Sequence, residues 1–150
     1  GTSLPTNPKS YEKVFVIAQC WGDEYFHFFA EALPRITLML DILRKHLDIK
    51  IALNAPQPTS KDYKTYMIQF LELLGLRQDR VIFIQEPIHA DLAIMSSSAP
   101  CFEPDARTTN ILRHTLLQAL YPSSGGVPFP PPRPVVILIV RNSLRWLRNS

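Results

Sequence analysis

The chain has 150 residues, of which 46% are apolar and 19% are charged, and its mean hydropathy is zero. This composition excludes a disordered chain, which has fewer apolar residues, and a membrane protein, which needs an unbroken apolar run of about 18 residues or more. Four of the 16 basic residues lie after residue 132, so residues 1–132 carry 12 basic side chains against 13 acidic ones. A basic end without a basic face points to a local anion site and argues against a nucleic-acid partner.

The ends of the chain and its cysteines set two further bounds. The chain begins with Gly1 instead of Met and stops inside an arginine-rich stretch, so we expect it to be a piece of a longer protein. Cys20 and Cys101 define neither a disulfide framework nor a zinc ribbon. They leave the redox compartment open.

The first part of the chain predicts a strand followed by a long helix. Residues 14–19 are β-branched and aromatic with almost no polar interruption, which is typical of a parallel strand that is buried on both faces. From Asp23 to Leu47, apolar residues recur every three or four positions, which predicts an amphipathic helix. Pro34 interrupts this pattern, so we expect either a kink or a second helix with Pro34 near its start.

A second strand and a second helix follow. Residues 49–53 are a short apolar run before a turn-rich segment, which predicts a strand. Thr59 or Ser60 is the expected N-terminal cap of a helix. The helix is expected to run to Leu74, because Gly75 stands where a left-handed C-terminal cap is typical.

The pattern continues with two strands and a helix. Residues 81–84 predict a third strand, and residues 90–95 are an ambiguous fourth. Thr108 or Thr109 is the expected cap of a third helix, which Tyr121 and the proline after it terminate.

The C-terminal part predicts a domain boundary. Six prolines between Pro122 and Pro134 indicate an extended linker, and residues 135–140 are the most strand-like run of the chain. We therefore predict a domain over residues 1–121, a linker over 122–134, and the truncated beginning of a second domain over 135–150.

The alternation of strands and helices favours an α/β fold with a parallel sheet wrapped by helices. Ligands bind beyond the carboxyl ends of the strands in such sheets. The segments just after Gln19 and just after Val140 are therefore the first candidate sites.

His27 and Glu31 follow the first strand and are four residues apart on the predicted helix, so their side chains share one face. A carboxylate in this position would orient the imidazole and raise its basicity, and the other ring nitrogen would accept a proton from a substrate hydroxyl. The alternative is a surface ion pair without a catalytic role.

Arg141 and Arg145 follow the last predicted strand and are also four residues apart. Together with the donors of a helix that begins near Asn142, they would converge on an anion such as a diphosphate. The alternative is a solvated basic stretch or an amphipathic segment that binds an acidic partner. Glycine-rich nucleotide loops and metal-ligand spacings are absent from the sequence, so we expect no metal and no permanently bound cofactor.

These residues carry a resemblance to a known family. The segment around His27, together with two later pieces, resembles the glycosyltransferase family 61 domain, which includes plant xylosyltransferases and O-linked N-acetylglucosaminyltransferases of the endoplasmic reticulum. The resemblance spans roughly residues 12–149. The residues that carry it are Gln19, Trp21, 25–29, Glu31, 33–35, 70–75 and 136–140, followed by Arg141, Arg145 and Asn149.

The resemblance implies a GT-B architecture of two Rossmann-like halves, with the active site between them and an inverting transfer of a sugar of the N-acetylglucosamine, xylose or arabinose type. The donor would be a UDP-sugar, and the acceptor a hydroxyl of a glycan or glycoprotein. On the acceptor side, His27 and Glu31 would be catalytic, and Arg35, Trp21 and Tyr25 would bind substrate.

On the donor side, the resemblance implies that Arg141, Arg145 and Asn149 bind the diphosphate. It further implies the lumen of the Golgi or endoplasmic reticulum in a eukaryote, with a membrane anchor outside this segment. Because most of the donor half would be missing, the fragment alone is expected to be inactive.

Two departures from the family pattern favour an alternative. Asn142 stands where the family has a second basic residue, and Ser150 stands where it has an acidic one. The alternative is a non-catalytic carbohydrate-binding or interaction module that has lost donor binding.

Overall fold

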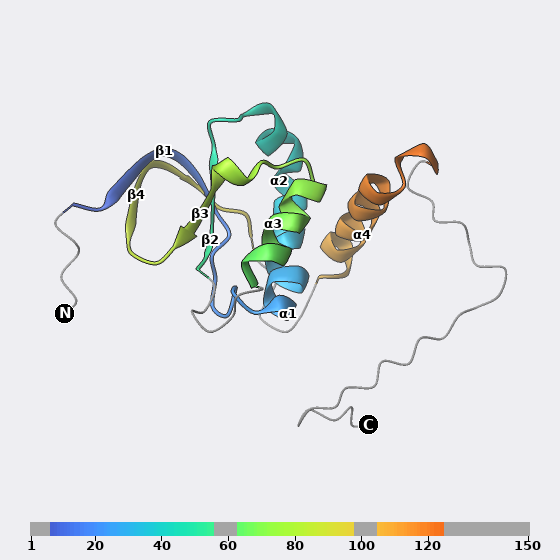
Figure 1. Ribbon diagram of the computed structural model, residues 1–150. Helices are drawn as coiled ribbons and strands as arrows, with labels where there is room; N and C mark the ends of the chain where they lie inside the picture. The colour runs from blue at the N-terminus through green and yellow to red at the C-terminus, as the bar shows by residue number, and fades with distance from the viewer. Residues whose placement is uncertain (1–6, 56–62, 98–104, 125–150) are drawn as a thin grey trace, which may run out of the picture.

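The computed structural model describes residues 7–55, 63–97 and 105–124 and contains a four-stranded parallel sheet (Figure 1). Its strands pair in the order β3-β2-β1-β4 and are all parallel. The sheet with its flanking helices confirms the α/β class. The strands are β1 (Lys9–Val16), β2 (Lys50–Asn54), β3 (Val81–Ile84) and β4 (Ile88–Ile94).

β1 begins five residues earlier and ends three residues earlier than the apolar run predicts. Its polar first half pairs with β4 from Lys9 onwards, and backbone pairing does not need apolar side chains. At the other end, Ile17 and Ala18 both donate their backbone N–H to the carbonyl oxygen of Ala52, at 3.1 Å each. This doubled contact ends the regular ladder, so residues 17–19 leave the strand although they are apolar or half-buried.

β4 confirms the fourth strand, although it starts two residues before the ambiguous run 90–95 and ends one residue before its end. Only residues 85–87 separate it from β3, yet the two strands pair on opposite sides of the β1 and β2 pair. The chain therefore passes from one edge of the sheet to the other without a helix (Figure 1).

Pro34 lies near the start of a second α-helical stretch, as one of the two expectations had it, but the chain stays helical between the two stretches. α1 (Tyr25–His27) passes into a π-helical turn, η1 (Phe28–Ala32), and then into α2 (Leu33–Lys45), with Pro34 as the second residue of α2. The N–H of Leu33 donates to the carbonyl oxygen of Phe28, five residues back. Proline lacks an N–H and its ring would clash with the carbonyl four residues earlier, which explains why the helix widens at this point.

The second predicted helix is α3 (Tyr63–Leu73), and its expected caps Thr59 and Ser60 lie outside the described residues. Gly75 has the predicted left-handed conformation, with a φ of 76°. The side chain of Arg44 donates two hydrogen bonds to the carbonyl oxygen of Leu74, at 3.1 and 2.9 Å, and so completes this helix end.

A buried arginine that was not predicted from the sequence, Arg80, precedes β3 and contacts the connection between α2 and β2. Arg80 ends the 3-10 turn η2 (Gln78–Arg80) and donates to the carbonyl oxygens of Leu43, His46 and Ile49 at 2.7 to 3.1 Å. These carbonyls lie at the end of α2 and in the turn before β2. Arg80 therefore holds the connection between α2 and β2 in place.

The third predicted helix is α4 (Ala106–Leu120), and the prediction of its cap was wrong. The cap is Asp105, whose Oδ2 accepts from the N–H of Thr108 at 2.8 Å, so Thr108 lies inside the helix as the residue that is capped. A 3-10 turn, η3 (Pro122–Ser124), follows, where the linker was expected to be extended. Residues 125–134 of the linker and the strand expected at 135–140 lie outside the described residues.

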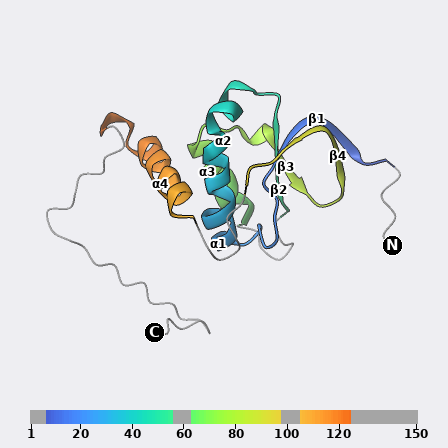
Figure 2. The ribbon, with the colours of Figure 1, turned by 180° about the vertical axis from the view of Figure 1, so that it is seen from behind.

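The helices and the core lie together on one side of the sheet. Figures 1 and 2 show all the described α-helices on that side. In the described residues, helices therefore cover one side of the sheet, whereas the sequence predicted helices around it. None of the described helices is both long and apolar enough to cross a bilayer. The core lies between β1, β2 and the helices α2 and α3, and its largest fully buried side chains are Phe15, Phe28, Ile17, Leu33, Ile36, Leu43, Ile51, Leu53, Met67, Leu71, Leu74 and Leu76.

Candidate functional site

His27 and Glu31 form the predicted pair. His27 is the last residue of α1, and Glu31 lies in the π-helical turn η1. The distance from His27 Nδ1 to Glu31 Oε1 is 3.0 Å. The two residues are only 4% and 5% exposed, so the pair does not lie on the surface as the alternative had it, and the alternative of a pair without a catalytic role stays open. Because an ionised carboxylate only accepts hydrogen bonds, Nδ1 carries the proton in this pair when Glu31 is charged.

Gln19 joins this pair to Arg35. Its amide Nε2 donates to Glu31 Oε2 at 2.7 Å, and its amide Oε1 accepts from Arg35 Nη1 at 3.2 Å. A single side chain from the segment after β1 therefore bridges two helical residues of opposite charge. Histidine, carboxylate, amide and guanidinium form one continuous chain of hydrogen bonds.

Asn54, the last residue of β2, fixes the position of Gln19. Asn54 Oδ1 accepts from the backbone N–H of Gln19 at 2.9 Å, and Asn54 Nδ2 donates to the backbone oxygen of Gln19 at 2.7 Å. The turn that follows is closed by a hydrogen bond from the N–H of Gly22 to the same oxygen, at 3.1 Å. Polar groups from the carboxyl ends of two neighbouring strands therefore meet as the fold class predicts.

Arg35 extends the network to a third strand. Its guanidinium donates to the backbone oxygen of Val16 at 3.2 Å and to the side chain of Ser96, just beyond β4, at 3.2 Å. Arg35 is 8% exposed, and this burial lowers the pKa of its guanidinium from the ordinary value, because a buried cation loses hydration. Its contacts with backbone oxygens compensate part of that loss.

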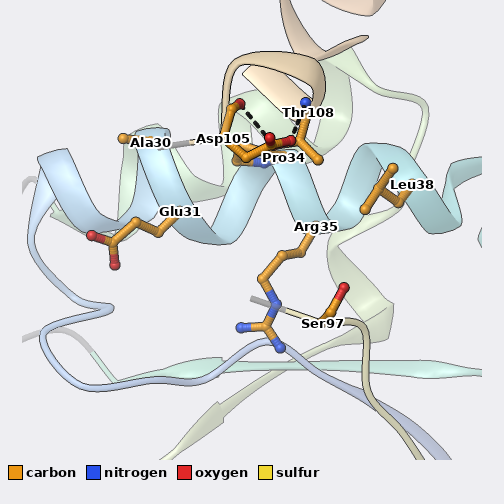
Figure 3. A pocket seen from close by; sticks show the side chains of 8 residues that line it. All are labelled: Ala30, Glu31, Pro34, Arg35, Leu38, Ser97, Asp105 and Thr108. Carbon is orange, nitrogen blue, oxygen red and sulfur yellow. Dashed lines mark hydrogen bonds between the residues drawn. The ribbon is translucent and has the colours of Figure 1, made fainter. Parts of the chain in front are cut away.

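A pocket borders the network on the side of α4. Figure 3 shows Glu31 and Arg35 leaving the same side of the helix, with Ser97 beside Arg35. Asp105 and Thr108, at the start of α4, line the opposite wall. The remaining lining residues are Ala30, Pro34 and Leu38.

Two exposed aromatic side chains, Trp21 and Tyr25, precede His27 in the chain. Trp21 is 58% exposed and has a φ of 59°, a left-handed conformation that is rare for a bulky residue. Tyr25 is 53% exposed, and its ring stacks on Phe29 at a centroid distance of 6.0 Å and meets Tyr66 edge-on at 5.1 Å. Trp21 belongs to the connection between β1 and α1, and Tyr25 is the first residue of α1. Their exposed rings offer flat apolar surface to a ligand.

The network combines the parts of an oriented general base. A carboxylate holds the imidazole, an amide holds the carboxylate, and a strand end holds the amide. The low exposure of His27 means that a substrate hydroxyl would have to enter the structure, or the segment would have to open, before a proton could be transferred.

The predicted donor-side residues cannot be compared with this site. Arg141, Arg145 and Asn149 lie outside the described residues. Within residues 7–55, 63–97 and 105–124, no group of three or more histidine, cysteine or acidic side chains is arranged to hold a metal ion.

Asn54 and Ser96 were not among the predicted site residues, and no separate role was predicted for Gln19. Asn54 ends the second strand and Ser96 follows the fourth. The rule that ligands bind beyond the carboxyl ends of parallel strands was applied only to the first and last predicted strands, and it selects both residues when it is applied to every strand. The contact between Gln19 and Glu31 has no spacing signal, because it depends on how the loop folds back on the helix.

Comparison of the chain with protein-family models, with curated proteins and with solved structures found no match. The resemblance to glycosyltransferase family 61 therefore rests on the residues of the sequence, and the chemistry of the site rests on its geometry.

Proposed function

We propose that this chain is the acceptor-side part of an inverting glycosyltransferase that uses a nucleotide sugar. The observation that carries the proposal is the His27–Glu31 pair, 3.0 Å apart, held by Gln19 at the carboxyl edge of a parallel sheet. Inverting transfer needs a base that takes the proton of the acceptor hydroxyl while the sugar–phosphate bond breaks. An imidazole oriented by a carboxylate is suited to this role.

The neighbouring side chains support a sugar as the ligand class. Trp21 and Tyr25, which shortly precede His27 in the chain, are more than half exposed, and the apolar face of a sugar ring can lie against such rings. The expected donor-binding residues, Arg141, Arg145 and Asn149, would stabilise the departing diphosphate from the second half. The GT-B architecture, the UDP-sugar donor and the glycan or glycoprotein acceptor belong to this proposal.

The burial of His27 favours a second candidate function. At 4% exposure, the imidazole and its partners satisfy one another as a structural core network does. A non-catalytic carbohydrate-binding or interaction module would keep this network and the exposed aromatics, and would need neither a base nor a donor site.

Turnover of a histidine variant tests the catalytic proposal. In the complete protein supplied with an oligosaccharide acceptor, transfer of the sugar from UDP-N-acetylglucosamine or UDP-xylose to the acceptor hydroxyl, followed as release of UDP, should fall by roughly 100-fold or more in His27→Ala, with little change in donor affinity. His114→Ala is the matched control, since His114 is exposed on α4 and its Nε2 contacts Gln118. A folded His27→Ala protein with an unchanged rate removes His27 from the mechanism.

Donor binding separates the two candidates. Titration calorimetry of the complete protein with UDP should show binding if it is a glycosyltransferase. A module that has lost the donor site should show no heat of binding for UDP but should still bind oligosaccharides.

A further inference from the structure

We infer that Gln19 is a positioning residue that reserves the Glu31 carboxylate for His27 by keeping it from Arg35. The inference deepens the proposed function, on which its catalytic meaning rests. The structural part concerns which partner Glu31 binds and can be tested without any enzymatic assay.

The helix offers Glu31 two competing partners. His27 lies four residues before it and Arg35 four residues after it, so both can reach the same carboxylate. Arginine is the stronger competitor, because its planar guanidinium is always charged and can bind both carboxylate oxygens at once. A glutamate that precedes a cation by four residues is also the favoured orientation on a helix.

The structure nevertheless gives Glu31 to the weaker partner. Among the described residues, the ion pair of Glu31 is with His27, and Arg35 instead donates to Gln19, Ser96 and backbone oxygens. The amide of Gln19 stands between the two charges, with its NH₂ group toward Glu31 and its oxygen toward Arg35. This orientation satisfies both charged groups at once, so neither gains by approaching the other.

Gln19 can act in this way because it is held independently of the helix. Both of its backbone polar atoms bind the side chain of Asn54 at the end of β2. The sheet therefore fixes where the amide stands, and the amide decides which neighbour the carboxylate binds. In the proposed reaction, this keeps the imidazole in the tautomer whose Nδ1 is protonated, so that Nε2 is the basic nitrogen.

The tautomer of His27 is the decisive readout. In the protein labelled with ¹⁵N at histidine, a two-bond proton–nitrogen correlation spectrum identifies the protonated ring nitrogen of each of the four histidines. His27→Asn assigns the signals. We expect a single Nδ1-protonated tautomer for His27 in the wild type. In Gln19→Met, which keeps the volume but removes the amide, this single tautomer should be lost, because Glu31 turns to Arg35.

Two further variants make the result specific. Gln19→Asn keeps an amide that is one methylene too short to bridge, and it should lose the single tautomer as Gln19→Met does. Gln118→Met removes an amide that stands 3.0 Å from His114 on exposed α4, and it should leave His27 unchanged. A folded Gln19→Met or Gln19→Asn protein in which His27 remains Nδ1-protonated overturns the inference, because the helical pair would then form without Gln19.

A measurement on the wild type applies if neither Gln19 variant folds. The side-chain amide protons of Gln19 should exchange with solvent more slowly than those of exposed Gln118, and equal exchange rates contradict the bridge. In the turnover assay, a folded Gln19→Met protein should lower kcat and leave KM for the donor unchanged. A tautomer change without any UDP release from the wild type would retain the positioning role and reject the glycosyltransferase.

Discussion

Gly22 leaves no space for a side chain because the amide of Asn54 fills it. A β-carbon at residue 22 would overlap Asn54 Oδ1 and approach Asn54 Cγ to 2.9 Å. That oxygen is also the acceptor for the N–H of Gln19, so it cannot move aside without losing the contact that positions the site.

Gly22→Ala should therefore destabilise the protein by roughly 1–3 kcal/mol, the usual cost of overpacking. Urea unfolding measures this loss. Gly75→Ala is the matched control, because a β-carbon there meets only Arg44 at 3.7 Å and costs about 1–2 kcal/mol for the left-handed backbone alone. Only Gly22→Ala should change the His27 tautomer, and an unaltered tautomer in that variant would mean that Asn54 does not position Gln19.

Trp21 keeps a left-handed backbone, with a φ of 59°, while more than half of its side chain is exposed. A positive φ at a bulky residue indicates local backbone strain, which the exposed ring does not relieve by packing. Comparison of two truncations isolates the strain, since Trp21→Gly and Trp21→Ala both remove the ring but only glycine accepts a positive φ easily. Trp21→Gly should be about 1 kcal/mol more stable than Trp21→Ala in chemical unfolding.

The same two variants address ligand binding. If Trp21 contacts a sugar, both should lose affinity for an oligosaccharide ligand equally, because the contact belongs to the ring and not to the backbone. Glycine and alanine variants that are equally stable would show that residue 21 carries no strain.

The sequence predicts the elements of this fold better than the contacts of its site. The spacing of His27 and Glu31 was sufficient to predict their contact, because two residues four apart on a helix are neighbours whatever surrounds them. Pro34 likewise predicted that the regular α-helix is interrupted near this position, since the missing N–H and the ring are local properties. Their burial was not predictable from spacing, because it depends on packing against a distant strand end.

The start of β1 was missed because a partner distant in sequence decides it: its first half is polar and is a strand because β4 pairs with it. The cap of α4 is a different case, because Asp105 lies only three residues before Thr108 and aspartate is a favoured cap, so the local sequence did carry that signal. Gln19 and Asn54 are 35 residues apart, and only the parallel pairing of β1 with β2 brings them together. Such contacts follow from topology and have no signature in the local sequence.

The cap of α4 predicts how stability should vary with pH. The hydrogen bond from the N–H of Thr108 lowers the pKa of the Asp105 carboxyl below its ordinary value. A lowered pKa means that the charged form stabilises the folded state. The stabilisation is complete above the unfolded pKa of about 3.9 and is lost as the pH falls through the folded value.

Asp105→Asn keeps a capping oxygen but cannot ionise. The difference in unfolding free energy between wild type and Asp105→Asn should therefore be present at neutral pH and should shrink in the acid range below the unfolded pKa. Asp41→Asn, on the exposed side of α2 and away from any cap, controls for the loss of a surface charge. A difference that stays constant down to the acid limit contradicts the role of the carboxylate.

Arg35 should contribute to stability through its geometry as much as through its charge. It donates to backbone oxygen of Val16 and to Ser96, so it ties α2 to the ends of β1 and β4. Arg35→Met leaves such buried acceptors unsatisfied and should cost roughly 1–3 kcal/mol. Arg35→Lys should recover little of this loss, because a single ammonium group cannot reproduce the divergent donors of a planar guanidinium.

Arg44→Met, on the exposed side of the same helix, is the control. It should lower the unfolding free energy less in the same urea titration, because the two hydrogen bonds of Arg44 reach a single carbonyl oxygen. If Arg35→Lys recovers the full unfolding free energy, charge alone matters at residue 35. The geometry of the guanidinium would then have no role in the network.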